Sequence, residues 1–196
     1  LSLEQMSAAT AALPSACRGA VSVLLDDGSV QSYAGTSSKL YKLSGLATWE
    51  DVTRASGGDY SVGTGEQWKW ALYGTNLVAV NVVDGCQTID ITSGTEFDAL
   101  TDAPAARYVD VIRDFLLLGA ISGNEKRVQW SANGNSEGWT SGTGESDFQD
   151  LPNGGPVRGV IGGETGYIFQ ASKVTRMAYV AGSPLIFQFD EIEGAA

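Results

Sequence analysis

Short apolar runs separated by glycine-rich turns are the main pattern of this sequence after Pro14. The runs are rich in Val, Ile, Leu, Tyr and Trp, and they alternate with turn sequences such as DDG, GTN, VDG, SGN and GETG. Short strands bounded by such turns are typical of all-β proteins. The pattern therefore predicts an all-β fold. Only residues 2–13 suggest a short helix, because Ser2 and Gln5 can form a capping box and Pro14 ends the segment.

The predicted strands form a unit that occurs four times. A basic residue opens each unit at the start of a strand, a second strand follows a tight turn, and a third strand comes next. A segment that contains Trp or Phe then closes the unit, as WEDV, FDAL, FQDL and IFQFDEI. The four opening residues are Arg18, Lys69, Arg107 and Arg158. They are 51, 38 and 51 positions apart, near the repeat length of known propellers.

These units predict a β-propeller-like array of four-stranded antiparallel blades. We expect blades at about residues 17–54, 68–100, 106–151 and 156–193, after an N-terminal arm or short helix over residues 1–16. Blades bury their faces by stacking around an axis. After the last unit, the sequence shows no segment that would close a ring of blades. We therefore expect these four blades to be part of a larger propeller. The expected blade core is Trp70, Leu72, Val80, Val109, Val111, Phe115, Leu117, Ile168 and Phe169.

The charge and composition narrow the function. The chain of 196 residues has 12 Lys and Arg against 23 Asp and Glu, which gives a net charge of −11. Such a chain repels free nucleic acid and anionic membranes. It contains no His, which excludes Ser-His-Asp and Cys-His triads and the usual zinc sites. No apolar run approaches a membrane span, and we expect no metal, no cofactor and no catalytic residue.

Arg18, Lys69, Arg107 and Arg158 are the sharpest candidate for a site. If the fold is a propeller, they form a basic collar at one mouth of its channel. The collar can be structural, with each cation paired to a neighbouring blade, because Arg offers five donors in a rigid fork. It can also guide a polyanion, or bind a carboxylate as the arginine cluster of sialidases does.

Four other features are candidate sites. SANGNSEGW at residues 131–139 resembles the Asp-box turn of sialidase propellers, but Asn133 stands where the Asp should be. Asp110 and Asp114 could act as a carboxylate pair, although an ion pair between Asp110 and the collar is the favoured interpretation. The turn Asp26-Asp27-Gly28 could bind calcium, but Asp-Gly is also a preferred hairpin turn. The five tryptophans are expected in blade packing more than as sugar platforms: Trp49, Trp68, Trp70, Trp130 and Trp139.

Six segments follow one another from Pro14 onward: CRGAVSVLLDDGSVQSYAGTSSKLYKL, WEDVTR, WKWALYGTNLVAVN, APAARYVDVIRDFLLLG, RVQWSANGNSEGWT and GYIFQASKVTRMAYVAGSPLIFQFDEIE. In this order they resemble the tail hub or nozzle proteins of short-tailed bacteriophages. The resemblance implies a structural virion protein, without enzymatic activity, in the virion tail that is assembled in the cytoplasm of the bacterial host. It implies a ring, expected to be a hexamer, below the portal and adaptor proteins.

In such a ring the protein would enclose the DNA ejection channel and anchor tail fibres or a needle, with DNA only as passing cargo. A negative channel wall would let DNA slide, because it repels phosphates. The alternative hypothesis is a glycan-active or glycan-binding, sialidase-like propeller, and the arginines that open three of the four units support it.

Overall fold

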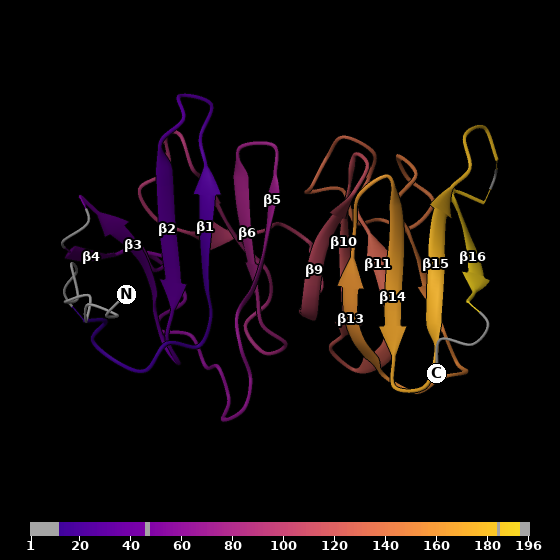
Figure 1. The fold of residues 1–196 in the computed structure, drawn as a ribbon, viewed down its shortest axis with the longest axis horizontal. Coiled ribbons are helices and arrows are strands. Elements are labelled where there is room, and N and C mark those ends of the chain that lie inside the picture. The colour runs from indigo at the N-terminus through magenta and orange to yellow at the C-terminus, as the bar shows by residue number, and fades with distance from the viewer. Residues whose placement is uncertain (1–11, 46–47, 184, 193–196) are drawn as a thin grey trace, which may run out of the picture.

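The computed structural model describes residues 12–45, 48–183 and 185–192, and these residues form four antiparallel sheets of four strands each (Figure 1). No helix occurs within these ranges, and so none that could span a membrane. The prediction of an all-β fold built from four-stranded antiparallel sheets is confirmed. Most of the helix predicted over residues 2–13 lies outside the described residues.

Each sheet is a simple meander in which every strand pairs with the next one along the chain. Sheet 1 contains β1 (Ala20–Leu24), β2 (Val30–Gly35), β3 (Leu40–Ser44) and β4 (Thr48–Asp51). Sheet 2 contains β5 (Lys69–Tyr73), β6 (Asn76–Val80), β7 (Gln87–Asp90) and β8 (Asp98–Ala99). Sheet 3 contains β9 (Ala106–Ile112), β10 (Phe115–Ile121), β11 (Asn124–Trp130) and β12 (Asp147–Asp150). Sheet 4 contains β13 (Val157–Ile161), β14 (Thr165–Gln170), β15 (Val174–Tyr179) and β16 (Phe187–Glu191).

The sheets follow one another along the long axis of the molecule, with sheets 1 and 4 at opposite ends (Figure 1). Their first strands make the connection, since β1 contacts β5, β5 contacts β9, and β9 contacts β13. A parallel bridge between Ile112 and Gly163 extends the contact of the last two sheets. The first strands of successive sheets are therefore neighbours in space.

Three apolar cores hold the array together, one between each pair of successive sheets. The second strands of sheets 2 and 3 contribute to a core on each face. In β10, Leu116 and Leu118 enter the core shared with sheet 2, and Phe115 and Leu117 enter the core shared with sheet 4. Successive side chains of a strand point to opposite faces, so a strand covered on both faces is a continuous apolar run. All seven residues of β10 are accordingly buried.

The predicted blade core agrees with the structure at most positions. Five of the nine residues are buried, namely Val80, Val109, Phe115, Leu117 and Ile168. Trp70 and Val111 are partly buried and pack against the cores.

The prediction that Leu72 and Phe169 belong to the blade core is wrong, because both side chains are 37% exposed. Leu72 lies one residue before the end of β5, at a point where a cavity separates the turns of sheets 1 and 2. Phe169 lies on the face of β14 that points away from sheet 3, where the described residues provide no further sheet. In both cases the alternation of side chains along the strand places the residue on one face of its sheet. Among the described residues, nothing covers that face at this position.

Trp68 fills the junction between sheets 1 and 2. Its side chain is 1% exposed, and its indole N–H donates a 2.9 Å hydrogen bond to the carbonyl oxygen of Thr36. The ring lies against the backbone of Gly35, so close that a Cβ atom there would be 2.2 Å from Trp68 Cδ1. Only glycine leaves room for the ring at this position.

We expect Gly35→Ala to lower the free energy of unfolding by about 1–3 kcal/mol, because the added methyl group overfills a site that cannot expand. Gly63→Ala is a matched control, since a Cβ at Gly63 would have Glu66 Cγ at an ordinary 3.7 Å as its nearest contact. Urea unfolding followed by tryptophan fluorescence measures both variants. Equal stability of the two variants would contradict this account of Trp68.

Candidate functional site

Three of the four predicted collar residues meet at one cavity. Lys69, Arg107 and Arg158 come from the starts of β5, β9 and β13, and they line a cavity of about 240 Å³. The rest of the lining is Gly65, Glu66, Gln67 and Tyr108. The three strands are neighbours in the array, so residues near their starts can reach one cavity.

The three cations differ in how they are paired. Arg107 forms ion pairs with Glu66, through Nη1, and with Glu125, whose carboxylate oxygen lies 3.6 Å from Nη2. Lys69 Nζ donates a 3.1 Å hydrogen bond to the amide oxygen of Gln67. No carboxylate of the described residues forms an ion pair with Lys69 or Arg158. The structural interpretation of the collar thus applies to Arg107. Lys69 and Arg158 have no counter-charge among the described residues.

Arg18, the fourth predicted residue, does not line this cavity. Its carbonyl oxygen accepts a 2.8 Å hydrogen bond from the Trp68 amide, immediately before Lys69 in the chain. Its Nε atom is buried and has no hydrogen-bond partner in the structure. Arg18 therefore belongs to the junction of sheets 1 and 2, next to the cavity.

Glu66 is a residue of this site that the sequence did not indicate. It lies in the connection between sheets 1 and 2, where its amide N–H donates to the Gly63 carbonyl oxygen at 3.1 Å. No repeat or strand pattern marks this connection. The glycines at 63 and 65 signal a turn, but the partner of Glu66, Arg107, is 41 residues further along the chain.

Asp110 and Asp114 have separate local roles. The carboxylate of Asp110 accepts backbone N–H hydrogen bonds from Val111 at 2.7 Å and from Gly162 at 3.0 Å, which ties β9 to the end of β13. The favoured interpretation of Asp110 as an ion-pair partner of the collar is therefore wrong among the described residues. Asp114 is an exposed turn residue whose carbonyl oxygen accepts a hydrogen bond from the Tyr73 hydroxyl at 2.8 Å.

Residues 131–139, the segment that resembles an Asp-box, form turns after β11. Trp130 and Trp139 are 3% and 6% exposed, and their indole N–H groups donate to the carbonyl oxygens of Glu145 and Ser136. The side chain of Asn133 donates a 2.7 Å hydrogen bond to the Glu145 carboxylate. Buried indoles offer no face for a sugar to stack on, so these two tryptophans serve packing.

The buried tyrosines are poor nucleophiles. Burial raises the pKa of Tyr33 and of Tyr60 to about 12. A nucleophile needs the opposite change, because a lowered pKa increases the fraction of phenolate near neutral pH.

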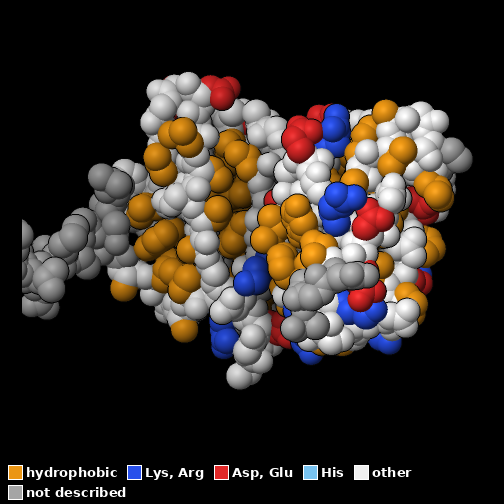
Figure 2. Space-filling view, turned by 45° about the vertical axis from the view of Figure 1, so that its right-hand side comes forward, with side chains coloured by type: hydrophobic (Ala, Val, Ile, Leu, Met, Phe, Trp, Pro, Cys, Tyr) orange, Lys and Arg blue, Asp and Glu red, His pale blue; other side chains and the backbone are white. Residues whose placement is uncertain are grey.

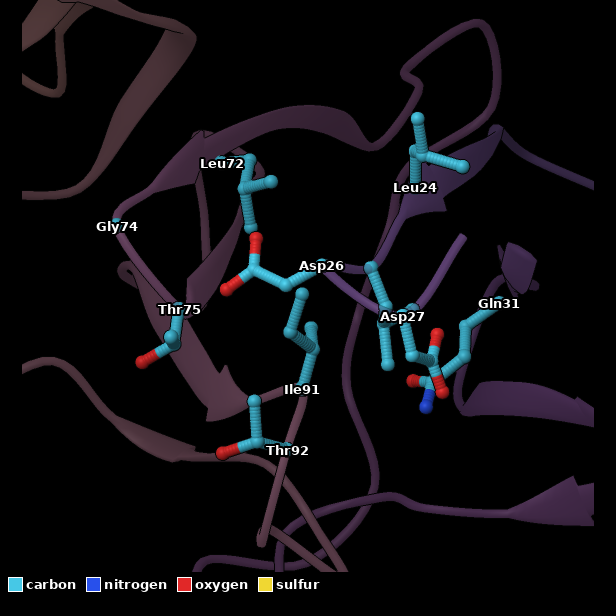
Figure 3. Close-up of a pocket in the computed structure, with 10 residues that line it drawn as sticks. Leu24, Asp26, Asp27, Gln31, Leu72, Gly74, Thr75, Ile91 and Thr92 are labelled. Carbon is cyan, nitrogen blue, oxygen red and sulfur yellow. The ribbon is translucent and has the colours of Figure 1, made fainter. Parts of the chain in front are cut away.

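A larger cavity, of about 360 Å³, lies between the hairpin turns of sheets 1 and 2 (Figure 3). Leu24 and Leu72 are among its apolar lining residues, and Asp26 directs its carboxylate towards Leu72 (Figure 3). Asp27 accepts a 2.8 Å hydrogen bond from the Ser29 amide, and bonds from Ser29 lower the pKa of this carboxyl. The turn thus uses Asp27 to hold its own backbone. Among the described residues, no three His, Cys, Asp or Glu side chains form a group that could hold a metal ion.

No protein-family model matches the sequence, and no curated protein matches it. The resemblance to phage tail hub or nozzle proteins therefore stays a hypothesis that the order of the segments supports.

We expect Asp110→Ala to lower the free energy of unfolding by about 1–3 kcal/mol, since it leaves two partly buried N–H groups without their acceptor. Asp114→Ala is the matched control and should change stability by no more than about 0.5 kcal/mol, as is usual for exposed side chains. Urea unfolding measures both. If the two substitutions had the same effect, the link between β9 and β13 through Asp110 would not contribute to stability.

Proposed function

We propose that the chain is a structural subunit of the tail of a short-tailed bacteriophage, a nozzle or hub protein. Its propeller blades would form part of a ring below the portal and adaptor proteins, around the channel through which DNA is ejected. It would act through contacts with neighbouring subunits and with fibre or needle proteins, and would catalyse no reaction. The ordered segments that resemble such proteins motivate the proposal.

The exposed apolar face of sheet 4 is the observation that carries the proposal. Ile161 lies opposite Tyr167, and Phe169 lies opposite Val174, so these side chains share the face that points away from sheet 3. Ile161 is 53% exposed, and Tyr167 and Phe169 are 36% and 37% exposed. An apolar face of this kind at the end of a sheet array favours a partner.

The partner that fits this face best is another four-stranded sheet, supplied by a neighbouring subunit. The three cores within the chain are already formed in this way, by the facing sides of successive sheets. The polar part of the same face carries the ion pair of Arg176 with Asp190, at 2.8 Å. Figure 2 shows charged side chains next to hydrophobic ones on the half of the molecule that carries sheets 3 and 4.

The charge of the chain suits a conduit for DNA. A net charge of −11 gives a mainly negative surface, which repels phosphates at a distance. DNA would then pass through the ring without being held. In a ring of subunits, the DNA channel lies between the propellers and does not follow their own axes.

We expect the double substitution Tyr167→Ser and Phe169→Ser to leave the fold intact and to prevent assembly. Both side chains are already more than a third exposed, so their loss removes few contacts within the chain. Light scattering after gel filtration measures the mass of the assembly, and electron microscopy shows its symmetry. Val83→Ser is the matched control, because Val83 is 59% exposed in the connection between β6 and β7.

The proposal predicts that electron microscopy of the assembled protein shows a ring. In images of whole particles, this ring should lie at a tail vertex. Wild-type protein that stays monomeric in the presence of portal and adaptor proteins would contradict it. A ring that the double variant still forms would keep the subunit role but exclude the sheet 4 face as its interface.

A second candidate function, a sialidase-like glycan site, is favoured by the shared cavity of Lys69, Arg107 and Arg158. Under the tail proposal we expect no hydrolysis of a fluorogenic sialoside by the purified chain. Hydrolysis that Arg107→Ala abolishes and Arg176→Ala retains would replace the tail proposal with the glycan-active one.

A further inference from the structure

We propose that the cavity at the starts of β5, β9 and β13 binds a small phosphoryl ligand, either inorganic phosphate or a phosphate monoester. Three cationic side chains from three different sheets line this one cavity. The chain has only 12 Lys and Arg in 196 residues, so their convergence at one point is a distinct feature of the fold. The proposal is independent of how the chain assembles.

The charges at the cavity favour an anion. Lys69, Arg107 and Arg158 supply three positive charges to the lining. Glu66 in the lining and Glu125 beside it both pair with Arg107, so Lys69 and Arg158 are the cations left for a ligand. The ion pair with Glu66 partly desolvates both partners, since the two side chains are 27% and 26% exposed. Lys69 and Arg158 face the same cavity without a carboxylate partner in the described residues, and like charges so placed repel one another. An anion between them would remove this repulsion.

The donors match a phosphoryl group. Arg158 offers the planar fork of N–H donors that suits phosphate oxygens, and Lys69 offers a compact charge with three donors. Gln67 accepts the Lys69 hydrogen bond with its amide oxygen, which leaves its NH₂ group as a further donor at the rim. The ion pairs of Arg107 with Glu66 and Glu125 hold its guanidinium in place beside the cavity.

The size of the cavity and the charge of the chain favour a small ligand over a nucleic acid. The volume of about 240 Å³ is below the range of about 300–1,000 Å³ that is usual for drug-sized ligands. It corresponds to roughly eight water molecules at about 30 Å³ each. A long polyanion would also meet the negative field of the whole chain, whose net charge is −11. A small anion meets mainly the local positive field.

Titration of the ¹⁵N-labelled chain, followed by NMR of backbone amides and arginine side chains, tests the proposal. The probes are inorganic phosphate, glycerol 3-phosphate, N-acetylneuraminate and a single-stranded oligonucleotide, all at constant ionic strength. We expect phosphate or glycerol 3-phosphate to bind with a Kd of about 1 mM or tighter and to shift signals of residues 65–69, 107–108 and 158. Whichever of the two phosphates binds more tightly identifies the source of the phosphoryl group.

Three variants distinguish a site from general attraction of anions. Arg158→Gln removes a charged donor and should weaken phosphate binding about tenfold. Glu66→Gln removes the negative charge of the lining and should strengthen binding several-fold. Arg176→Gln is the matched control, with the same change of charge on an arginine that is paired with Asp190 on another face, and it should leave the Kd unchanged within about twofold.

Several results would overturn the proposal. One is the absence of saturable shifts at these residues, and another is equal weakening by Arg158→Gln and Arg176→Gln. Tighter binding of N-acetylneuraminate than of either phosphate would assign the cavity to carboxylates. Binding of the oligonucleotide without binding of phosphate would assign it to nucleic acid.

Discussion

The need to cover both faces of each four-stranded sheet is the constraint on which this structure depends. A sheet of short apolar strands cannot be stable alone, because at least one apolar face would remain in water. Here the second strands of sheets 2 and 3, β6 and β10, present alternate side chains to two different cores. Burial of β10 on both faces therefore joins sheet 3 to sheet 2 on one side and to sheet 4 on the other. In sheets 1 and 4, at the two ends of the array, the described residues cover one face only.

Much of the fold follows from the sequence because the repeat determines both the strands and their order. The basic residue, the tight turn and the closing segment with Trp or Phe recur in four units, and all four sheets lie where these units predict. Leu72 and Phe169 mark the limit of this inference. Alternation along a strand shows which side chains share a face, but the presence of a covering sheet is a tertiary fact. Ile168 and Phe169 are both large apolar residues of β14, yet only Ile168 faces another sheet.

The candidate site was predictable only in part, for a similar reason. Equivalent positions of a repeat lie at equivalent heights, so the meeting of Lys69, Arg107 and Arg158 followed from their places in the units. Arg18 has the same place, but the carbonyl group of its backbone joins the junction around Trp68. Glu66 and the Asp110 carboxylate depend on contacts between distant segments, and no local pattern could indicate them. The repeat thus predicts where the cations lie but not what neutralises them.

The distribution of charge connects the two proposals. Several carboxylates are held by contacts within the chain: Asp27 accepts from its own turn, Asp110 links two sheets, and Asp150 accepts two hydrogen bonds of 2.7 and 2.9 Å from Arg127. The net charge of −11 acts at long range, where it repels polyanions. The cavity acts at short range, where Lys69 and Arg158 lie within reach of a small anion. A chain of this composition can repel DNA along its surface and still hold a small phosphate at one point.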